Sequence, residues 1–380
     1  MLALSIDELV REMKDLDASD LHLTAESKPV VRCRGKLETL DHHELLTSED
    51  TRDILYRILS TEQQKVLETR RHIDMAYSVP GVGRLRVNVF FQRSALGAAF
   101  RMIPTEIRSL AELGLPQHIE ALADKPRGLV LVTGPTGSGK STTLASLIDH
   151  INATRSEHIL TIEDPIEFLH NHQMCLVNQR EIGFDTPSFA EALRAALRQD
   201  PDVILVGEMR DLETISTALT AAETGHLVFA TLHTQSAPMT IDRVIDVFPA
   251  EQQDQVRIQL AGTLQGIVTQ NLVPTADGTG RIAALEILLP DDAVRNLIRQ
   301  GKVEQIYSVM QTGTSRGMQT MEQALADLML RGVISRQAAL SRSTKPEGLD
   351  ALLQRGVTLN APIQMSGSGL HGAGLHLAEV

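Results

Sequence analysis

Apolar residues recur at two different spacings in the first hundred positions of the chain. Ile6, Leu9, Val10 and Met13 repeat every three or four residues among acids, which predicts an amphipathic helix over residues 5–17. Further on, apolar and polar residues alternate in strand fashion, and N-cap residues precede two more helical segments. The expected strands are 19–23, 29–34, 36–40, 72–79, 84–93 and 97–103, and the expected helices begin at 48 and 60. This order predicts a small α+β domain that ends near Arg101.

From Gly128 onward, short apolar runs of the kind found in buried strands alternate with helical patterns. The expected strands are 129–133, 158–162, 203–206 and 227–231, and the expected helices are 144–151, 188–197, 212–223 and 241–247. This alternation is typical of a parallel sheet that is covered on both faces. Helical spacing then dominates and is interrupted by one strand pair. The helices expected there are 252–269, 293–300, 303–310, 321–330 and 335–341, and the strands are 270–274 and 280–289.

Changes in composition divide the chain into four parts. The α+β domain spans residues 1–101, and a proline-flanked linker is expected over residues 102–115. The strand–helix region and its C-terminal helices are expected to span residues 116–350. The last residues, rich in glycine, cannot bury enough apolar surface to fold alone, which predicts a flexible tail over residues 351–380.

The composition limits what the chain can bind. Its 36 Lys and Arg against 48 Asp and Glu give a net charge of −12, which opposes a generic binder of nucleic-acid phosphates. Without tryptophan and with 3% aromatic residues, it offers few platforms for base stacking. Cys33 and Cys175 form no C-x-x-C motif, and no apolar run approaches the length of a membrane span. We therefore expect a soluble protein of the reducing cytosol that binds no nucleic acid and has no integral membrane span.

A glycine-rich stretch follows the first buried strand of the second region. It matches G-x-x-x-x-G-K-[ST] between a predicted strand and a predicted helix, the context that this motif requires. Glycines let such a loop turn its amide N–H groups toward phosphate, and the helix N-terminus adds partial positive charge. Lys140 supplies a charge to the β- and γ-phosphates, and the hydroxyl of Ser141 is suited to Mg²⁺. The residues expected to bind nucleotide are Gly134, Pro135, Thr136, Gly137, Ser138, Gly139, Lys140, Ser141 and Thr142.

A group of acids follows the next predicted strand. Glu163, Asp164 and Glu167 come just after residues 158–162. In a parallel sheet, that position is the same edge as the phosphate loop. Acids there can orient water or hold hydrated Mg²⁺, although each taken alone could be a polar loop residue.

Another acid ends the strand 203–206. Four apolar residues lead into Gly207 and Glu208, as in a Walker B strand, but the acid is Glu in place of the usual Asp and a glycine precedes it. A divalent ion beside a triphosphate makes an acid at this position expected. We predict that Glu208 contributes to a Mg²⁺ site, partly through water.

Two histidines and a group of arginines complete the candidate chemistry. His226 and His233 flank the strand 227–231. Either could be a satisfied core histidine or a polar group that links the γ-phosphate site to a neighbouring subunit. The arginines lie on the last strands of the N-terminal domain and could form a solvated sheet face or, if that face meets nucleotide, contact the γ-phosphate. They are Arg84, Arg86, Arg93 and Arg101.

In this order, the four segments of the second region resemble the secretion-superfamily hexameric ATPases. They correspond to a Walker A loop, an Asp box, a Walker B strand that ends in Gly-Glu, and a His box. The resemblance runs from about Ala18 to about residue 345, and it is strongest to the type IV pilus retraction ATPases (PilT-like). Three segments are similar to that group nearly letter for letter, namely Leu205–Ile215, Thr220–His226 and Ile241–Glu251.

Two further features favour retraction over extension or secretion. Residues 293–300 resemble the C-terminal A-I-R-N-L-I-R-E signature of the retraction family, with Val294 for Ile and Gln300 for Glu. The extension and secretion relatives usually carry a long extra N-terminal domain and often a four-cysteine zinc insert. This chain begins at the small α+β domain and has two cysteines.

The resemblance implies a RecA-like P-loop NTPase domain that follows a small α+β (PAS-like) domain. It also implies a homohexamer that uses ATP and Mg²⁺. Glu163 or Glu167 is then the candidate for polarising the attacking water, and Glu208 is the Walker B acid. The remaining candidates are the histidines His226 and His233 and the arginines Arg86, Arg93 and Arg101, which would reach the nucleotide from the N-terminal domain.

The function implied is pilus retraction, in which hydrolysis drives pilus disassembly and twitching motility. The ring would lie at the cytoplasmic side of the inner membrane and act on a platform protein there, and related pilus ATPases are further candidate partners. The alternatives are an accessory retraction ATPase, a pilus-extension or type II secretion ATPase and, more remotely, a nucleic-acid translocase.

Overall fold

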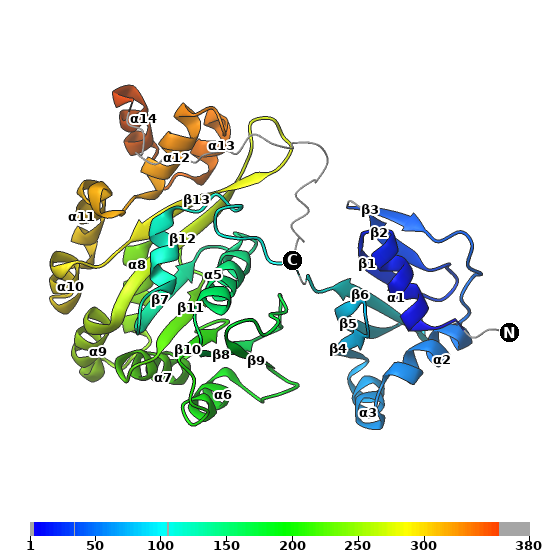
Figure 1. The fold of residues 1–380 in the computed structure, drawn as a ribbon. Helices are drawn as coiled ribbons and strands as arrows, with labels where there is room; N and C mark the ends of the chain where they lie inside the picture. The colour runs from blue at the N-terminus through cyan, green and yellow to red at the C-terminus, as the bar shows by residue number, and fades with distance from the viewer. Residues whose placement is uncertain (1–3, 34, 105, 357–380) are drawn as a thin grey trace. The chain divides into compact units, whose positions relative to one another are not determined.

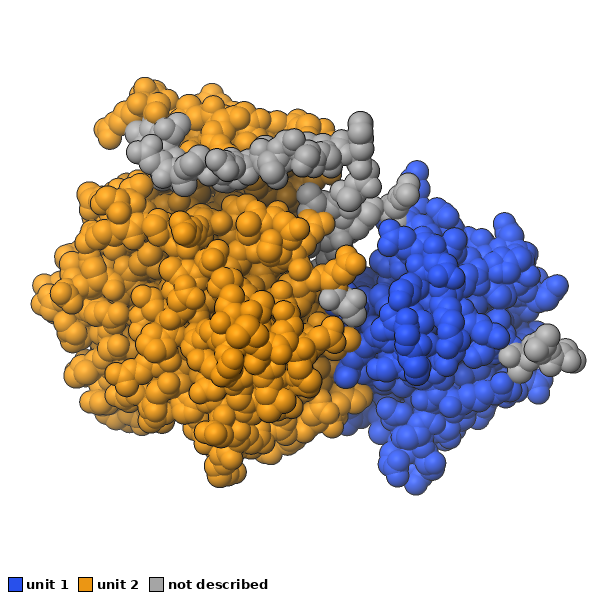
Figure 2. Space-filling view, in the orientation of Figure 1, with its two compact units in different colours: residues 1–105, 376–378 blue, residues 106–375, 379–380 orange. Residues whose placement is uncertain are grey.

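The computed structural model describes residues 4–33, 35–104 and 106–356 (Figure 1). The chain divides into two compact units, the first up to residue 105 and the second from residue 106 on (Figure 2). Each unit has its own hydrophobic core. Within the described residues, no helix is both long enough and apolar enough to cross a bilayer.

The first unit is a six-stranded antiparallel sheet with three helices, in the strand order β3-β2-β1-β6-β5-β4. Leu85 and Val87 on β5 are fully buried, whereas Arg86 between them is exposed, so the sheet turns one apolar face toward the helices. The strands are β1 Ala18–Leu23, β2 Val30–Cys33, β3 Lys36–Thr39, β4 His72–Val79, β5 Gly83–Gln92 and β6 Ala95–Met102. The helices are α1 Ile6–Asp15, α2 Ser48–Ile58 and α3 Thr61–Arg70.

The second unit contains a seven-stranded sheet in the order β13-β12-β7-β11-β10-β8-β9. All neighbouring strands are parallel except β13, which runs antiparallel to β12. The predicted α/β class is therefore confirmed, with one antiparallel edge strand. The strands are β7 Gly128–Thr133, β8 His158–Glu163, β9 Leu176–Glu181, β10 Val203–Val206, β11 Leu227–Leu232, β12 Leu264–Pro274 and β13 Arg281–Leu288.

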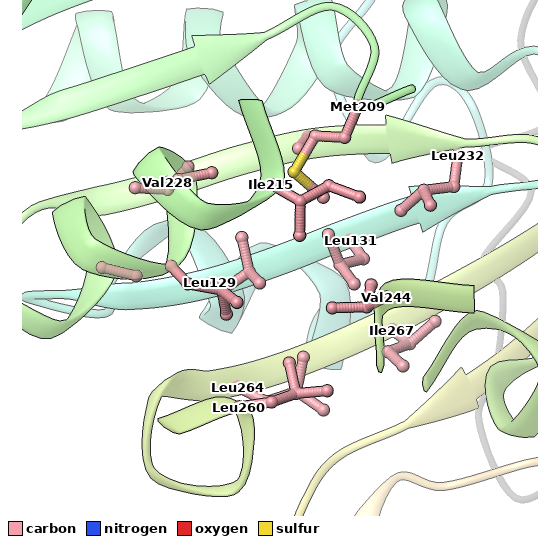
Figure 3. Close-up of a cluster of buried hydrophobic side chains, with 14 of the residues drawn as sticks. Leu129, Leu131, Met209, Ile215, Val228, Leu232, Val244, Leu260, Leu264 and Ile267 are labelled. Carbon is pink, nitrogen blue, oxygen red and sulfur yellow. The ribbon is translucent and has the colours of Figure 1, made fainter. Parts of the chain in front are cut away.

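Helices cover both faces of this sheet because its central strands are apolar on both sides. On β7, Leu129 and Leu131 point into one core with α7, α8 and α9, which Figure 3 shows in part. Val130 and Val132 point into the core on the other face, with α4 and α5. The helices are α4 Gln117–Ala123, α5 Lys140–Thr154, α6 Phe189–Ala196, α7 Leu212–Glu223, α8 Ala237–Asp246 and α9 Ala250–Thr263.

The C-terminal helices pack beside α9 and on the long hairpin formed by β12 and β13. α10 contacts α9, and α12 contacts β13 and α14 (Figure 1). A separate apolar cluster lies beneath α12, α13 and α14. These helices are α10 Asp292–Arg299, α11 Ile306–Thr312, α12 Met321–Leu330, α13 Arg336–Arg342 and α14 Pro346–Arg355, with 3₁₀ turns at Val303–Gln305 and Thr314–Arg316.

The structure corrects the expectation of a helix over residues 252–269. α9 ends at Thr263, and β12 begins at Leu264 and runs parallel to β7. Leu264, Ile267 and Val268 are fully buried, and such an apolar run fits a buried strand as well as a helix when spacing alone is considered. The expected strand pair is therefore longer at its start and belongs to the main sheet.

Other differences are smaller. α4, β9 and α14 were not expected from the sequence, and the helix expected over 303–310 is a 3₁₀ turn followed by α11. The tail expected from residue 351 cannot begin there, because α14 continues to Arg355. The rest of that prediction, from residue 357 on, lies outside the described residues.

The segment between the units is attached at both ends. The N–H of Ile103 donates to the carbonyl oxygen of Arg84 on β5 at 2.9 Å, and the Ile103 side chain is buried. In the second unit, the carbonyl of Arg108 accepts a hydrogen bond from Ser146 at 2.6 Å, and Leu110 joins the core. Residues 104–107 therefore separate the last anchor of one unit from the first anchor of the other.

Candidate nucleotide site

The glycine-rich loop connects β7 to α5 at the carboxyl end of the sheet. Thr133 ends β7, and its hydroxyl lies 2.8 Å from the hydroxyl of Thr269 on β12. Gly134 follows with a φ of 137°, and a Cβ there would collide with the backbone oxygen of Gln270. Gln270 is buried, and its Oε1 accepts a hydrogen bond from Thr143 of α5 at 2.8 Å. Glycine is required at position 134 because β12 runs directly beside the loop.

Lys140 is the first residue of α5, and its ammonium group lies against the loop. Nζ donates to the carbonyl oxygens of Gly134 and Pro135 at 3.0 and 3.1 Å. Burial lowers the pKa of Lys140, and the charges of Glu208 and Glu167 partly offset this effect. An ammonium that donates to neutral carbonyl oxygens can exchange these bonds for stronger ones to the charged oxygens of phosphate.

The loop also contains a buried polar atom that points to a ligand. Ser138 is 2% exposed, and its hydroxyl has no hydrogen-bond partner within the described part of the chain. Buried hydroxyls in folded proteins are nearly always hydrogen-bonded. The next hydroxyls, those of Ser141 and Thr142 in the first turn of α5, are only partly buried. The loop therefore fits a phosphate group with a metal ion beside it.

Glu163 is the last residue of β8. Its Oε1 accepts hydrogen bonds from the hydroxyl of Thr161 at 2.6 Å and from the amide of Gln179 at 3.1 Å. Burial raises the pKa of Glu163 to about 7 in spite of these bonds, and the charge of Glu167 contributes to the rise. A carboxyl group that titrates near neutral pH can accept a proton from water.

Gly207 and Glu208 follow β10. The N–H of Gly207 donates to the carbonyl of Ile162 at 2.7 Å, and a Cβ at this position would lie 3.1 Å from the same oxygen. Glycine therefore lets the ends of β8 and β10 approach. Glu208 pairs with Arg210 at 2.6 Å and with Nε2 of His233 at 3.1 Å. Burial alone would raise the pKa of Glu208, but Arg210 and His233 bring it below its usual value, so this carboxylate is ionised at neutral pH.

Strand order explains why these residues meet. Val206 at the end of β10 lies beside Ile162 of β8 and Ala230 of β11, and β11 is the neighbour of β7. Residues that follow parallel strands share the carboxyl edge of the sheet. The predicted site residues found at this edge are Lys140, Glu163, Glu167, Glu208 and His233.

His226 lies at the opposite edge of the sheet. It precedes β11, its carbonyl accepts a hydrogen bond from Gly128 at the start of β7, and its Nδ1 is 3.0 Å from the carbonyl oxygen of Ala221 in α7. His233 lies seven positions further along the extended chain, a distance of about 20 Å. The two histidines of the predicted pair therefore do not meet within one chain, and a catalytic role for His226 stays a prediction that needs a neighbouring subunit.

The arginines of the first unit also separate into two positions. Arg86 on β5 and Arg101 on β6 are directly paired across the strands, and Arg101 is held by buried Asp20 at 2.8 Å. Arg93 lies at the tip of the β5–β6 hairpin, with a φ of 45°. It is seven residues from Arg86, again about 20 Å. One phosphate group cannot be contacted by all three.

Three further residues support the site and were not predicted. Gln179 on β9 bonds Glu163 and also donates to the carbonyl of Phe168 at 2.9 Å, which braces the loop after β8. Gln270 lies beneath the glycine-rich loop, and Arg210 pairs with Glu208. Arg210 was visible in the sequence as a charge two residues after an acid. The two glutamines gave no signal, because β9 was not expected and the strand expected from Gln270 was not placed beside the glycine-rich loop.

This arrangement defines a class of protein. A phosphate-binding loop between strand and helix, an ionised acid after a neighbouring strand, and a second acid that titrates near neutral pH are the parts of a P-loop nucleoside triphosphatase. A hydrolytic site of this kind uses positioning and electrostatic stabilisation rather than a covalent intermediate.

Comparisons with known proteins identify the family within this class. The family model for type II/IV secretion system proteins matches residues 1–341. The chain is 52% identical over 344 residues to the type IV pilus retraction ATPase PilT of Pseudomonas aeruginosa, which covers 90% of this chain and 99% of the relative. It is 48% identical over 348 residues to a twitching motility protein of Neisseria gonorrhoeae, with 92% and 93% covered.

Solved structures agree. A crystal structure of the pilus retraction motor PilT with bound ADP has a TM-score of 0.86 at 52% identity, with 92% of this chain and 99% of that chain covered. The Legionella pneumophila ATPase DotB has a TM-score of 0.77 at 32% identity, with 88% and 94% covered. The chain belongs to the type II/IV secretion system protein family, and within it this protein is a PilT-like type IV pilus retraction ATPase.

Proposed function

We propose that this ATPase is the subunit of a homohexameric ring that hydrolyses ATP with Mg²⁺ to withdraw pilin subunits from a type IV pilus, and so drives twitching motility. The observation that carries the proposal is that Lys140, Glu163 and Glu208 meet at one sheet edge, where the pKa of Glu163 is raised to about 7 and that of Glu208 is lowered. Such a site, in a chain half identical to a retraction motor over nearly all its length, supports hydrolysis rather than nucleotide binding alone.

The site residues have separable roles in this reaction. The glycine-rich loop binds the β- and γ-phosphates through its amide groups, the Ser138 hydroxyl and the Lys140 ammonium. Ser141 and Glu208 would hold Mg²⁺, Glu208 partly through water, and the ion would neutralise charge on the phosphate oxygens. Glu163 accepts the proton of the attacking water. His233, which is 3.1 Å from Glu208, orients that carboxylate.

The arginines of the first unit would join hydrolysis to movement. An arginine supplied from another structural unit typically contributes about 10³–10⁵ in rate by stabilising charge on the transferred phosphate. If Arg86 and Arg101 contact the γ-phosphate, its loss releases the first unit. Residues 104–107, which lie between the anchors at Ile103 and Arg108, would then absorb the rotation.

The partners follow from this reading. The ring would stand at the cytoplasmic face of the inner membrane, where it would act on a platform protein at the pilus base, and related pilus ATPases could assemble with it. His226, remote from the site of its own chain, would serve at the boundary with an adjacent subunit. These assignments rest on the similarity to PilT and on the position of His226.

An accessory retraction ATPase is the second candidate. The chain is 41% identical over 353 residues to the type IV pilus ATPase PilU of Pseudomonas aeruginosa, with 93% of this chain and 92% of that relative covered. The higher identity to PilT favours the main motor.

Phosphate release by the purified full-length protein tests the site. Wild type should release phosphate with ATP and Mg²⁺ and lose this activity when Mg²⁺ is chelated, because the ion neutralises the γ-phosphate. Lys140→Ala should abolish turnover, because the phosphates lose the ammonium charge. The variant should keep the circular dichroism spectrum of wild type, because only one side chain at the start of α5 is shortened. Turnover near the wild-type rate in Lys140→Ala would contradict the assignment, and stimulation by single-stranded DNA would favour a translocase.

Labelled pili in cells that lack the gene separate the two motor roles. A main motor predicts pili that extend and do not shorten. An accessory ATPase predicts pili that still shorten, because another motor withdraws them.

A further inference from the structure

Two histidines and a glutamate meet in the first unit, which does not contain the glycine-rich loop. Nε2 of His42 lies 2.9 Å from one carboxylate oxygen of Glu12, and Nε2 of His43 lies 2.8 Å from the other. Glu12 belongs to α1, whereas the histidines belong to the connection between β3 and α2. The centroids of the two imidazole rings are 4.2 Å apart. Both rings turn Nε2 toward the same carboxylate.

The chain on either side of the histidines is fixed. Leu40 and Leu46 are both buried, and their N–H groups donate to the carbonyl oxygens of Pro29 and Ser27 at 2.9 Å each. The N–H of His43 donates to the carbonyl of Leu40 at 3.1 Å, which closes a turn. On the other side, α1 is held by apolar residues in the core of the unit. Both parts of the cluster are therefore placed by the fold.

The three side chains have the composition and spacing of a metal site. One ligand atom from each lies within 4.8 Å of the others. Ligand atoms about 2.1 Å from a tetrahedral zinc ion lie about 3.4 Å apart. The three ligand atoms therefore need to shift by about 1 Å to coordinate one ion. His42 is 64% exposed and free to make them, while Glu12 and His43 are 24% and 19% exposed and held in place.

We propose that Glu12, His42 and His43 bind a divalent transition-metal ion, with zinc as the probe, and that water completes the coordination. Two imidazole nitrogens and one carboxylate suit zinc, nickel or copper, whereas Mg²⁺ requires oxygen ligands. The ion is therefore distinct from the Mg²⁺ of hydrolysis. It ties α1 to the β3–α2 connection and stabilises the first unit. On binding, each Nε2 uses its lone pair, so a neutral ring keeps its proton on Nδ1, and a protonated ring releases one proton to solvent.

Isothermal titration of zinc into nucleotide-free, full-length protein with excess Mg²⁺ tests the site. Wild type should show one saturable equivalent that the double variant H42Q/H43Q lacks. Glu12→Gln should weaken zinc binding by at least about tenfold, because mutating even a residue that only supports a metal ligand lowers metal affinity by that factor. His72→Gln, which changes an exposed histidine of the same unit, is the matched control and should bind as wild type does.

Thermal unfolding gives the second readout. Zinc should raise the unfolding midpoint of wild type and of His72→Gln and leave that of H42Q/H43Q unchanged. The circular dichroism spectrum shows whether the double variant is folded. Absence of a zinc equivalent in wild type, or an unchanged equivalent in H42Q/H43Q, would overturn the proposal.

Discussion

Glu163 and Glu208 are carboxylates at the same edge of one sheet, yet their pKa values move in opposite directions. Burial raises that of Glu163 to about 7. Glu208 is also partly buried, but Arg210 and His233 hold its pKa below the usual value. Paired acids whose surroundings separate their pKa values commonly divide the work of a site. Glu208, whose pKa is lowered, suits a cation, and Glu163, whose pKa is raised, suits transfer of a proton.

The pH dependence of turnover should therefore follow Glu163. A general base acts only when deprotonated, so kcat should rise between pH 6 and pH 8 with an apparent pKa near 7. Glu163→Gln should lower kcat by about 10²–10⁴ and remove this rise, because an amide accepts no proton. Steady-state phosphate release across this pH range is the measurement. Glu191→Gln, at an exposed position on α6, should keep the wild-type profile, and a flat profile in wild type would contradict the assignment.

At the scale of elements, buried acids join the end of the nucleotide site to the C-terminal helices. The N–H of Ala237, which begins α8 four residues after His233, donates to Glu286 of β13 at 2.6 Å. Glu322 of α12 lies close enough for its charge to act on Glu286, and it accepts the hydroxyl of Tyr307 of α11 at 3.0 Å. Glu286 also accepts a hydrogen bond from the backbone of Met321, the first residue of α12, so a shift of α8 can reach α12, and through Glu322 also α11, by hydrogen bonds as well as packing.

Glu286 should make the stability of the second unit depend on pH. Burial raises its pKa to about 7, and the charge of Glu322 contributes. In the unfolded chain this carboxyl is ionised above about pH 5. At pH 6 the folded state therefore holds a proton that the unfolded state does not. The unfolding free energy falls as the pH rises to about 7 and is level above it. Between pH 6 and pH 8, the unfolding free energy of wild type should fall by about 1 kcal/mol more than that of Glu286→Gln, as measured by urea unfolding.

A matched variant separates charge from hydrogen bonding at this position. Glu286→Gln keeps an acceptor for the N–H of Ala237, whereas Glu286→Ala leaves that N–H buried without one. The alanine variant should lose about 1–3 kcal/mol of unfolding free energy at both pH values. Equal pH slopes in wild type and Glu286→Gln would show that Glu286 does not hold the proton.

The same scale shows what the sequence could and could not predict. α7 and α12 lie where their apolar spacing and N-cap residues place them, and the phosphate loop is recognised from the spacing of its glycines, lysine and serine. The start of β12 was missed, because residues 264–268 are buried by tertiary contacts that spacing does not encode. Gln179 and Gln270 were missed for the same reason. They support the site from strands that are distant in sequence, and nothing local marks them.

The residues that resemble the retraction signature lie mainly on α10, and this helix is anchored to the rest of the second unit. Val294 and Ile298 are buried, and Arg295 donates to carbonyl oxygens at the end of α9. Asn296 is exposed and Leu297 is partly buried. Replacing Asn296 and Leu297 together by alanine should spare ATP hydrolysis and stop pilus withdrawal, because the helix keeps its anchors. Phosphate release and the shortening of labelled pili are the two measurements, and normal shortening would contradict this role.

At the scale of the whole molecule, catalysis and movement can be coupled only if a group from the first unit senses the γ-phosphate. Arg86 and Arg101 are paired across β5 and β6, and Arg93 is about 20 Å along the sheet. If these arginines reach the nucleotide as proposed, one γ-phosphate can be contacted from only one of the two positions. The pair is the better choice, because Asp20 fixes Arg101 at 2.8 Å and two guanidinium groups act together.

Arg86→Ala should lower kcat by about 10³-fold or more and change ATP affinity much less, because an arginine of this kind acts mainly on the transition state. Arg86→Lys should not restore the rate, since an ammonium cannot bind two phosphate oxygens in the fork geometry of guanidinium. The control is Arg57→Ala, at an exposed position on α2 of the same unit. Phosphate release and equilibrium binding of a non-hydrolysable ATP analogue separate the two effects. Equal losses in affinity and kcat would mean that Arg86 holds the nucleotide without sensing its cleavage, and hydrolysis would then have to move the first unit by another contact.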